Sequence, residues 1–223
     1  TCPPDSDLLI STRKGKAIRF PITDDTLRMF KSRSSTGVRG IKLMAGDEVV
    51  SISILRHVEA TADERMAYLK RASQLRNQVE DSEDNGAGDE EEAASGNVVL
   101  TDERFNELAA QEDFLLAVTS RGFGKRTSAY EYRTTGRGGS GIWNMKLSAR
   151  NGEIVCSYNI KDNDEVMLVT NGGQIIRMPV ADVRFVGRQT QGVTLFRIEA
   201  DEQVVSAAVI RDAGEGPDAE GNE

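Results

Sequence analysis

The sequence predicts an all-β fold of propeller-like blades, each with four antiparallel strands, forming three blades of a larger ring with one helical insertion. Two observations lead to this prediction. Three parts of the chain begin alike, each with an apolar strand, a glycine-bearing turn and a second strand that carries an arginine. Apolar and polar residues also alternate in strand-like runs such as VVSISI, residues 49–54, which is typical of half-buried antiparallel strands.

The repeat has a regular period that one insertion interrupts. The aligned turn glycines and second-strand arginines are Gly15, Gly122 and Gly173, and Arg19, Arg126 and Arg177. The step from the second copy to the third is 51 residues, whereas the step from the first to the second is 107. An insertion of about 56 residues therefore separates the first two copies.

A second motif follows in each copy, an arginine four residues before a glycine. The matching stretches are RSSTG at 33–37, RGGSG at 137–141 and RQTQG at 188–192. Each precedes an alternating run and then a further apolar strand, so the repeat unit has four strands. We expect Gly37, Gly141 and Gly192 to adopt positive φ or to let another backbone come close.

Gly136, Gly138 and Gly141 also spell G-x-G-x-x-G, the pattern of a dinucleotide-binding loop. Such a loop follows an apolar strand and opens a helix, whose N-terminus binds the pyrophosphate. Here the loop opens IWNMKL, which alternates like a strand, and the same slot in the other copies keeps only the arginine and the last glycine. We therefore interpret the match as accidental.

The insertion, residues 56–112, differs from the repeats in composition. Thr61 and Glu64 form a capping box at the start of a predicted helix, whose apolar residues at helical spacing are Tyr68, Ala72, Leu75 and Val79. The acidic run that follows has no apolar anchors and is expected to be disordered. Thr101 caps a second, short helix that contains Phe105 and Leu108. We expect the two helices to pack together on the edge of a blade.

These observations divide the chain into five segments. They are residues 1–55, the first blade with the end of a preceding unit; 56–112, the insertion; 113–160, the second blade; 161–210, the third blade; and 211–223, a disordered acidic tail. Three blades are too few to close a ring, because propellers use four to eight. Since the chain also begins abruptly, we expect a fragment of a longer protein.

Composition argues against an enzyme active site, a metal site or a membrane span. The two cysteines, Cys2 and Cys156, lie far apart, and the lone His57 has no catalytic or ligating partners in the sequence. No apolar run approaches the roughly 18 residues that a transmembrane helix needs. No signal peptide opens the chain, so we expect a cytosolic protein with free thiols.

The net charge of −8 is unevenly distributed along the chain. The first and second blades carry +3 and +4, whereas the insertion carries −9, the third blade −2 and the tail −4. Basic side chains that recur at equivalent places in each blade would form a curved positive track on one rim, where phosphates bind without base recognition. The candidate DNA-binding residues are Arg13, Lys14, Lys16, Arg19, Arg33, Arg39, Arg121, Lys125, Arg126, Arg133, Arg137, Arg177 and Arg188.

These side chains also admit other interpretations. Edge lysines and arginines prevent sheets from aggregating, so the charges could be solvated edge residues without a ligand. Stacking on single-stranded DNA is disfavoured, because the aromatic residues are expected to fill blade interfaces. These residues are Phe20, Phe123, Tyr130, Tyr132 and Trp143.

The three units resemble blades of the C-terminal β-pinwheel of the DNA gyrase A protein, and more generally of bacterial type IIA topoisomerases. The matching stretches are STGVRGIKL, GFGKRTSAYEY, NGGQIIRM and VGRQTQGVTLFRI. The heptapeptide of that family, Q-[RK]-R-G-G-[RK]-G, occupies the slot that reads TGRGGSG here. The positions that match are Arg137, Gly138, Gly139 and Gly141, and those that differ are Thr135, Gly136 and Ser140.

The resemblance implies sequence-independent wrapping of duplex DNA within a type IIA topoisomerase that introduces negative supercoils with ATP. It implies a gyrase B partner in an A2B2 holoenzyme, with ATP and Mg²⁺ bound by the cleavage core and by gyrase B, and no cofactor in this segment. It further implies a cytoplasmic, nucleoid-associated protein. Because the full heptapeptide and the active-site tyrosine are absent, neither supercoiling nor cleavage is expected from this chain alone.

Several interpretations remain open after the resemblance. The acidic tail is expected either to tune wrapping, by competing with phosphate for the rim, or only to solubilise the chain. The chain could instead be the equivalent domain of topoisomerase IV, which usually lacks such a tail. A third possibility, of a different class, is a propeller that serves as a platform for protein interactions.

Overall fold

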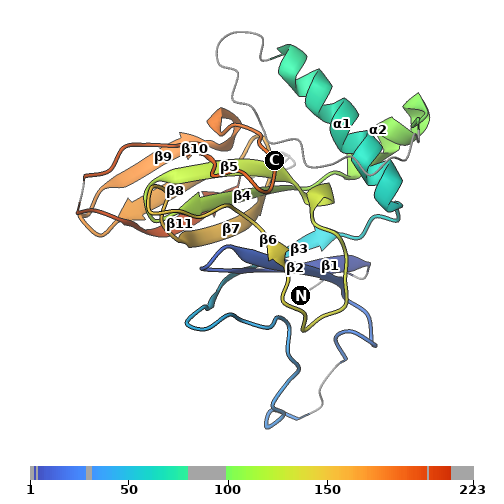
Figure 1. The fold of residues 1–223 in the computed structure, drawn as a ribbon, viewed down its shortest axis with the longest axis horizontal. Coiled ribbons are helices and arrows are strands. Elements are labelled where there is room, and N and C mark those ends of the chain that lie inside the picture. The colour runs from blue at the N-terminus through green and yellow to red at the C-terminus, as the bar shows by residue number, and fades with distance from the viewer. Residues whose placement is uncertain (1–2, 4, 29–31, 80–98, 200, 212–223) are drawn as a thin grey trace, which may run out of the picture.

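The computed structural model describes residues 3, 5–28, 32–79, 99–199 and 201–211. Three antiparallel sheets follow one another along the chain, and two helices pack beside the second sheet (Figure 1). The predicted all-β fold of blades with a helical insertion is confirmed. No helix among these residues is long and apolar enough to cross a membrane.

Each sheet has one central hairpin, flanked by one or two further strands. Blade 1 contains β3 (Val49–Arg56), β1 (Ser6–Thr12), β2 (Lys16–Pro21) and β6 (Ile142–Trp143), in this order. Blade 2 contains β10 (Val193–Thr194), β5 (Phe123–Ser128), β4 (Phe114–Thr119) and β7 (Ile154–Ile160). Blade 3 contains β11 (Val204–Ile210), β8 (Glu165–Thr170) and β9 (Ile175–Pro179).

The fourth strand of blades 1 and 2 comes from the following repeat. β6 belongs to the second repeat but pairs with β2, and β10 belongs to the third repeat but pairs with β5. The expectation that each repeat forms its own four-stranded blade is therefore wrong by one strand. The cause is the connection after the second strand, which runs along the preceding blade: the amide of Thr135 donates to the carbonyl of Arg19 over 2.8 Å.

Gly141 and Gly192 permit this exchange, because each precedes an exchanged strand. Their φ angles are +68° and +76°, as expected from the sequence. A Cβ on Gly192 would lie 2.7 Å from the carbonyl oxygen of Gly124, and one on Gly141 would overlap the carbonyl of Ala17. The third motif glycine, Gly37, also has positive φ, at +73°. Gly141 is followed by the strand β6 and not by a helix, so the predicted strand after the G-x-G-x-x-G match is confirmed.

Two apolar layers join the blades. Between blades 1 and 2, Leu9 and Leu55 pack against Leu115, Ala129 and Tyr132. The layer between blades 2 and 3 is larger, and its buried residues are Leu116, Val118, Cys156, Ile160, Val166, Leu168, Val180, Val183, Val204 and Ala207. Cys156 is a free thiol within this layer, and burial raises its pKa to about 12, so the thiol is unreactive at neutral pH.

The insertion forms two helices, α1 (Ala62–Val79) and α2 (Asp102–Gln111). The predicted capping box is present: the amide of Glu64 donates to the Thr61 hydroxyl, and the amide of Thr61 donates to the Glu64 carboxylate. Thr101 caps α2 by accepting from the amide of Arg104. The buried members of their shared layer are Tyr68, Ala72, Phe105 and Leu108, together with Tyr130 of blade 2. The acidic run and tail, residues 80–98 and 212–223, lie outside the described residues.

Candidate nucleic-acid interface

Arg19 joins blades 1 and 2 and does not lie on an exposed rim. Only 4% of its side chain is exposed. Its Nε donates to the buried carboxylate of Asp7 over 2.6 Å, its Nη1 to the carbonyl of Ala129 over 2.8 Å and its Nη2 to the carbonyl of Arg56 over 2.9 Å. The expectation that Arg19 reaches phosphates is wrong, because its guanidinium is occupied inside the protein.

Arg126 makes the equivalent contact between blades 2 and 3. Its Nη2 donates to the carbonyl of Ala181 over 2.9 Å, and its Nε donates to the carbonyl of Val183. Its Nη1 reaches Asp162 at 2.7 Å, and its guanidinium stacks 3.9 Å from the centroid of the Phe185 ring. The placement of Arg126 on the rim is likewise wrong. We call Arg19 and Arg126 the inter-blade arginines.

Lys125 is also buried, so the prediction that it binds DNA is wrong. Its ammonium donates to the carbonyl of Gly187 over 2.9 Å and to that of Arg188. Burial lowers the pKa of Lys125 to about 7, although the nearby Glu131 carboxylate opposes this shift. Burial in turn raises the pKa of Glu131. We call the loops that carry the motif of an arginine four residues before a glycine the RxxxG loops. Lys125 thus fixes the backbone of the third RxxxG loop and cannot itself contact DNA.

Replacing Lys125 by methionine should flatten the pH dependence of stability. Between pH about 7 and 10.5 the unfolded chain holds a proton on Lys125 that the folded protein does not, so this group makes the free energy of unfolding rise with pH. The Lys125→Met protein lacks this pH-dependent contribution to the free energy of unfolding. The hydrogen bonds that it loses lower the free energy of unfolding by the same amount at every pH. Urea denaturation of both proteins from pH 7 to 9.5 measures their free energies of unfolding. Parallel pH profiles would contradict the lowered pKa of Lys125.

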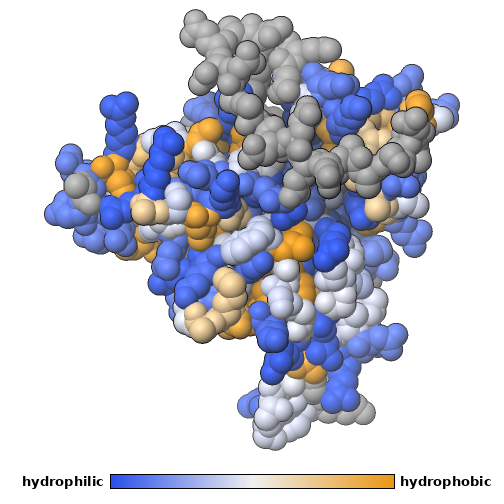
Figure 2. Space-filling view, in the orientation of Figure 1, coloured by the Kyte–Doolittle hydropathy of each residue, from blue (hydrophilic) through white to orange (hydrophobic). Residues whose placement is uncertain are grey.

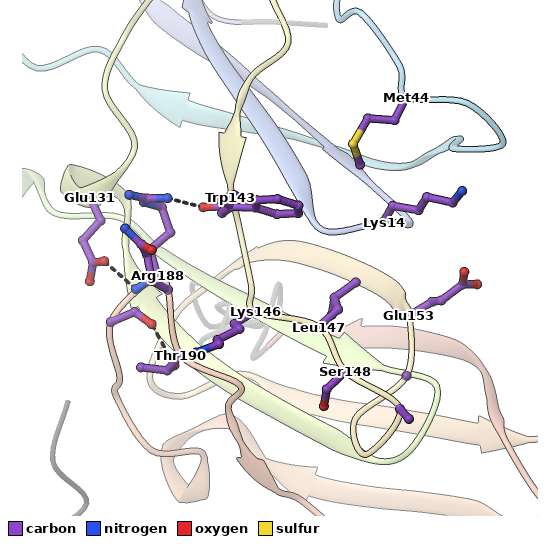
Figure 3. Close-up of a pocket in the computed structure, with 14 residues that line it drawn as sticks. Lys14, Met44, Glu131, Trp143, Lys146, Leu147, Ser148, Glu153, Arg188 and Thr190 are labelled. Atoms are coloured by element: carbon purple, nitrogen blue, oxygen red, sulfur yellow. Dashed lines mark hydrogen bonds between the residues drawn. The ribbon is translucent and has the colours of Figure 1, made fainter. Parts of the chain in front are cut away.

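Cations that are exposed or half-buried gather where successive repeats meet. Lys14, Lys146 and Arg188 line a cleft of about 1040 Å³ between blades 1 and 2. In Figure 3 Trp143 lies in the middle of this cleft, with Arg188 and Glu131 on one side and Lys14 on the other. The Nη1 of Arg188 donates to the carbonyl of Trp143, which holds this arginine against β6.

The expectation that Trp143 fills a blade interface is wrong. Its side chain is 45% exposed, so it does not fill a blade interface. The ammonium of Lys16 lies 3.6 Å from the centroid of its ring, a cation–π contact that keeps Lys16 at the surface. Lys16 and Trp143 are also paired residues of β2 and β6. The exchanged strand thus carries an aromatic residue onto the basic surface.

A recurring cation that the sequence analysis missed lies beside these loops. Lys42, Lys146 and Arg197 each follow the motif glycine of their repeat by five positions, and all three are exposed. The amide of Lys42 donates to the carbonyl of Gly139 over 2.8 Å, and the amide of Lys146 donates to that of Thr190 over 3.1 Å. Gly139 and Thr190 occupy the same place in successive RxxxG loops, so both seams have the same geometry.

These contacts order the cations into a row across the repeats. At one seam Lys42 adjoins the loop of Arg137, whose Nη1 donates to the carbonyl of Arg39 over 3.2 Å. At the next seam Lys146 adjoins the loop of Arg188. We call Lys42, Arg137, Lys146, Arg188 and Arg197 the cationic row. Most of the face shown in Figure 2 is hydrophilic, and its apolar patches are small and interrupted.

The remaining candidates are not members of this row. Arg33 and Arg133 are exposed in the loops that precede the first two motif glycines. Arg13 is exposed but paired with Glu48, and Arg121, half-buried in the β4–β5 turn, donates to the carbonyl of Glu202 over 3.5 Å. Arg177 lies on β9 of blade 3, where it is exposed and paired with Glu165. The structure therefore does not bring Arg177 into the cationic row.

Fold and surface together define a class of protein: a propeller-like repeat protein whose seams carry a row of cations. Comparison with known families is consistent with that class. The chain belongs to the family described as DNA gyrase C-terminal domain, beta-propeller, whose model matches residues 6–56, 113–155 and 164–211. The matched segments are the three repeats, and the insertion falls between the first two.

Curated relatives and a solved structure agree with this membership. The DNA gyrase A protein of Granulibacter bethesdensis is 49% identical over 212 residues, covering 92% of this chain and 23% of the relative. The DNA gyrase A protein of Rickettsia bellii is 44% identical and covers 96% and 23%. The chain thus spans about a quarter of the length of these relatives. A crystal structure of the C-terminal domain of DNA topoisomerase IV shares the fold, with a TM-score of 0.60 at 18% identity over 92% of this chain and 46% of that one.

Proposed function

We propose that this chain binds duplex DNA without sequence preference along the cationic row and bends the duplex around the blades. The observation that supports the proposal most directly is the repeated seam, in which an exposed lysine of one repeat adjoins the arginine-bearing loop of the next. Cations at regular steps on a curved surface meet phosphates rather than base edges. Bending costs of order 1–6 kcal/mol per 20–30 base pairs, which several such contacts offset.

The assignment to DNA rather than to another polyanion rests on the family. Relatives that match almost the whole chain are DNA gyrase A proteins. The proposed setting is therefore a type IIA topoisomerase in the cytoplasm, associated with the nucleoid, that introduces negative supercoils with ATP. In that setting gyrase B is the partner in an A2B2 assembly, ATP and Mg²⁺ bind outside this segment, and the chain contributes DNA wrapping without catalysis.

Salt titration of DNA binding tests the proposal on the chain itself. We expect fluorescence anisotropy with two duplexes of unrelated sequence to give equal affinities. The plot of log K against log salt should have a slope of about −4 to −5, from about 0.9 per phosphate contact for the five cations of the row. Absence of duplex binding at low salt would overturn the proposal and favour a protein-interaction platform.

A topological measurement separates wrapping from simple binding. A nicked plasmid sealed by ligase in the presence of the chain should show a shifted linking-number distribution if the duplex is wrapped. If the chain binds the plasmid but the linking-number distribution does not shift, the chain binds DNA without wrapping it, and the wrapping part of the proposal is wrong. The control is the same ligation at a salt concentration that abolishes binding in the anisotropy titration.

A further inference from the structure

The exchanged strand β6 carries a tryptophan that the repeat does not require. Trp143 lies two positions after its motif glycine, where the other repeats have Arg39 and Thr194. At the next seam Thr194 pairs with Phe123, just as Trp143 pairs with Lys16, so strand exchange occurs there without an aromatic residue at this position. Tryptophan is highly buried on average, yet this indole is exposed. Its exposure therefore points to a contact with a ligand.

The indole of Trp143 is held in one position at the cleft between blades 1 and 2. The backbone carbonyl of Trp143 accepts from Nη1 of Arg188, and the ammonium of Lys16 lies 3.6 Å from the centroid of the ring. Trp143 lines the cleft, whereas Lys16 is not among the lining residues. Lys16 therefore covers one face of the ring and leaves the rest of the ring for the cleft. A ring that is fixed before a ligand arrives lowers the entropy cost of binding.

The cleft combines apolar surface with positive charge. Leu147 and Met44 line it together with Trp143 (Figure 3). Lys146 and Arg188 line it as well, and no described residue accepts from the ammonium of Lys146. A planar group can therefore stack on the indole while an attached anion reaches a free ammonium.

The two carboxylates of the cleft leave this positive charge available. Glu131 is already engaged, since its carboxylate accepts from the amide of Arg188 over 2.5 Å. Glu153 lies beside Lys14 in Figure 3, at the side of the cleft away from Lys146 and Arg188. A nucleotide has the matching combination of a planar base and an anionic phosphate, and stacking of a base on an aromatic side chain does not depend on its sequence.

We propose that this cleft binds an unpaired base of DNA, which stacks on Trp143 while the adjoining phosphates contact Lys146 and Arg188. The inference rests on the proposed function, because Lys146 and Arg188 belong to the cationic row and DNA that follows the row passes the cleft. The bases of a regular duplex are stacked inside it, and extruding one costs least where the base has no partner. The cleft therefore selects DNA with an unpaired nucleotide, a feature that the cationic row alone does not distinguish.

Tryptophan fluorescence tests the proposal directly, because Trp143 is the only tryptophan of the chain. The probes are three duplexes of one sequence: fully paired, with one bulged deoxyadenosine, and with an abasic residue in place of that deoxyadenosine. The bulged base should quench the fluorescence and bind at least about fivefold more tightly than the abasic bulge. Both bulges have the same phosphates and both interrupt the helix, so this difference reports the base and not the ease of bending.

Two variants show whether the preference depends on the indole. Trp143→Ala should bind the bulged and abasic duplexes equally in anisotropy titrations, whereas Trp143→Phe should keep part of the difference. Circular dichroism and the thermal midpoint confirm that both variants are folded.

The outcomes separate this inference from the proposed function. If the wild-type chain binds the paired duplex but does not distinguish the bulged base from the abasic bulge, the inference is wrong and the proposed function stands. If it binds none of the duplexes, both are wrong. A preference that persists in Trp143→Ala would also overturn the inference. So would quenching by free deoxyadenosine monophosphate without a preference for the bulged base, which would assign the cleft to free nucleotides.

Discussion

Replacing Arg19 by alanine should destabilise the protein by about 3–5 kcal/mol, because the buried Asp7 carboxylate loses its guanidinium partner and keeps only the contacts of its oxygens with His57 Nδ1 and the Thr134 hydroxyl. The carbonyls of Ala129 and Arg56 lose a donor as well. The loss should appear as a lower urea midpoint with an unchanged m-value. Arg19→Lys should recover part of the stability, since an ammonium keeps the charge but cannot reach all three acceptors.

Arg177→Ala is the matched control for this measurement. It removes the same residue type from the same repeat position, but on an exposed surface where only Glu165 is lost as a partner. Its urea midpoint should stay close to that of the wild type. Equal midpoints for Arg19→Ala and Arg177→Ala would contradict the inter-blade role of Arg19.

Neutralising one cation of the row in each repeat should weaken DNA binding at low salt at least about tenfold. The variant is Lys42→Gln, Lys146→Gln and Arg197→Gln, three exposed side chains at equivalent positions. If each meets one phosphate, the slope of log K against log salt should become shallower by about 2.7, at about 0.9 per contact. Anisotropy titrations at several salt concentrations give both quantities.

A control variant with the same change in charge isolates the position of the cations. Lys70, Lys161 and Arg211 are exposed and lie outside the row, on α1 and at the ends of the blade 3 segment. Their combined change to glutamine should leave the salt slope nearly unchanged and lower the affinity only through the net charge. If both triple variants behaved alike, binding would depend on overall charge and the row would have no specific role.

Features governed by local rules could be predicted from the sequence. The capping box at Thr61 and Glu64, the positive φ of Gly141 and the hairpins with their turn glycines depend on a few neighbouring residues, and the structure has them as expected. The repeat period was equally informative, because each copy supports the same strand assignment. Family membership follows from those repeated stretches and is confirmed by the family match.

Features that depend on distant partners could not be predicted in this way. Arg19 looked like a surface cation because the acceptor that buries it, the Ala129 carbonyl, lies 110 residues away. Strand exchange escaped detection for the same reason, since alternation identifies a strand but not its neighbour. The recurrence of Lys42, Lys146 and Arg197 was visible in the sequence, five residues after each motif glycine, but only their exposure separates them from the buried inter-blade arginines.

Strand exchange determines where the chain can be shortened without exposing an unpaired edge. A truncation at the end of the second repeat, residue 160, would delete β10 and leave the outer hydrogen-bonding groups of β5 without a partner. It would also remove the Val183 carbonyl that receives Arg126. A soluble two-blade fragment must therefore extend past Thr194, so the units that can be excised from this protein are longer than the units that repeat in it.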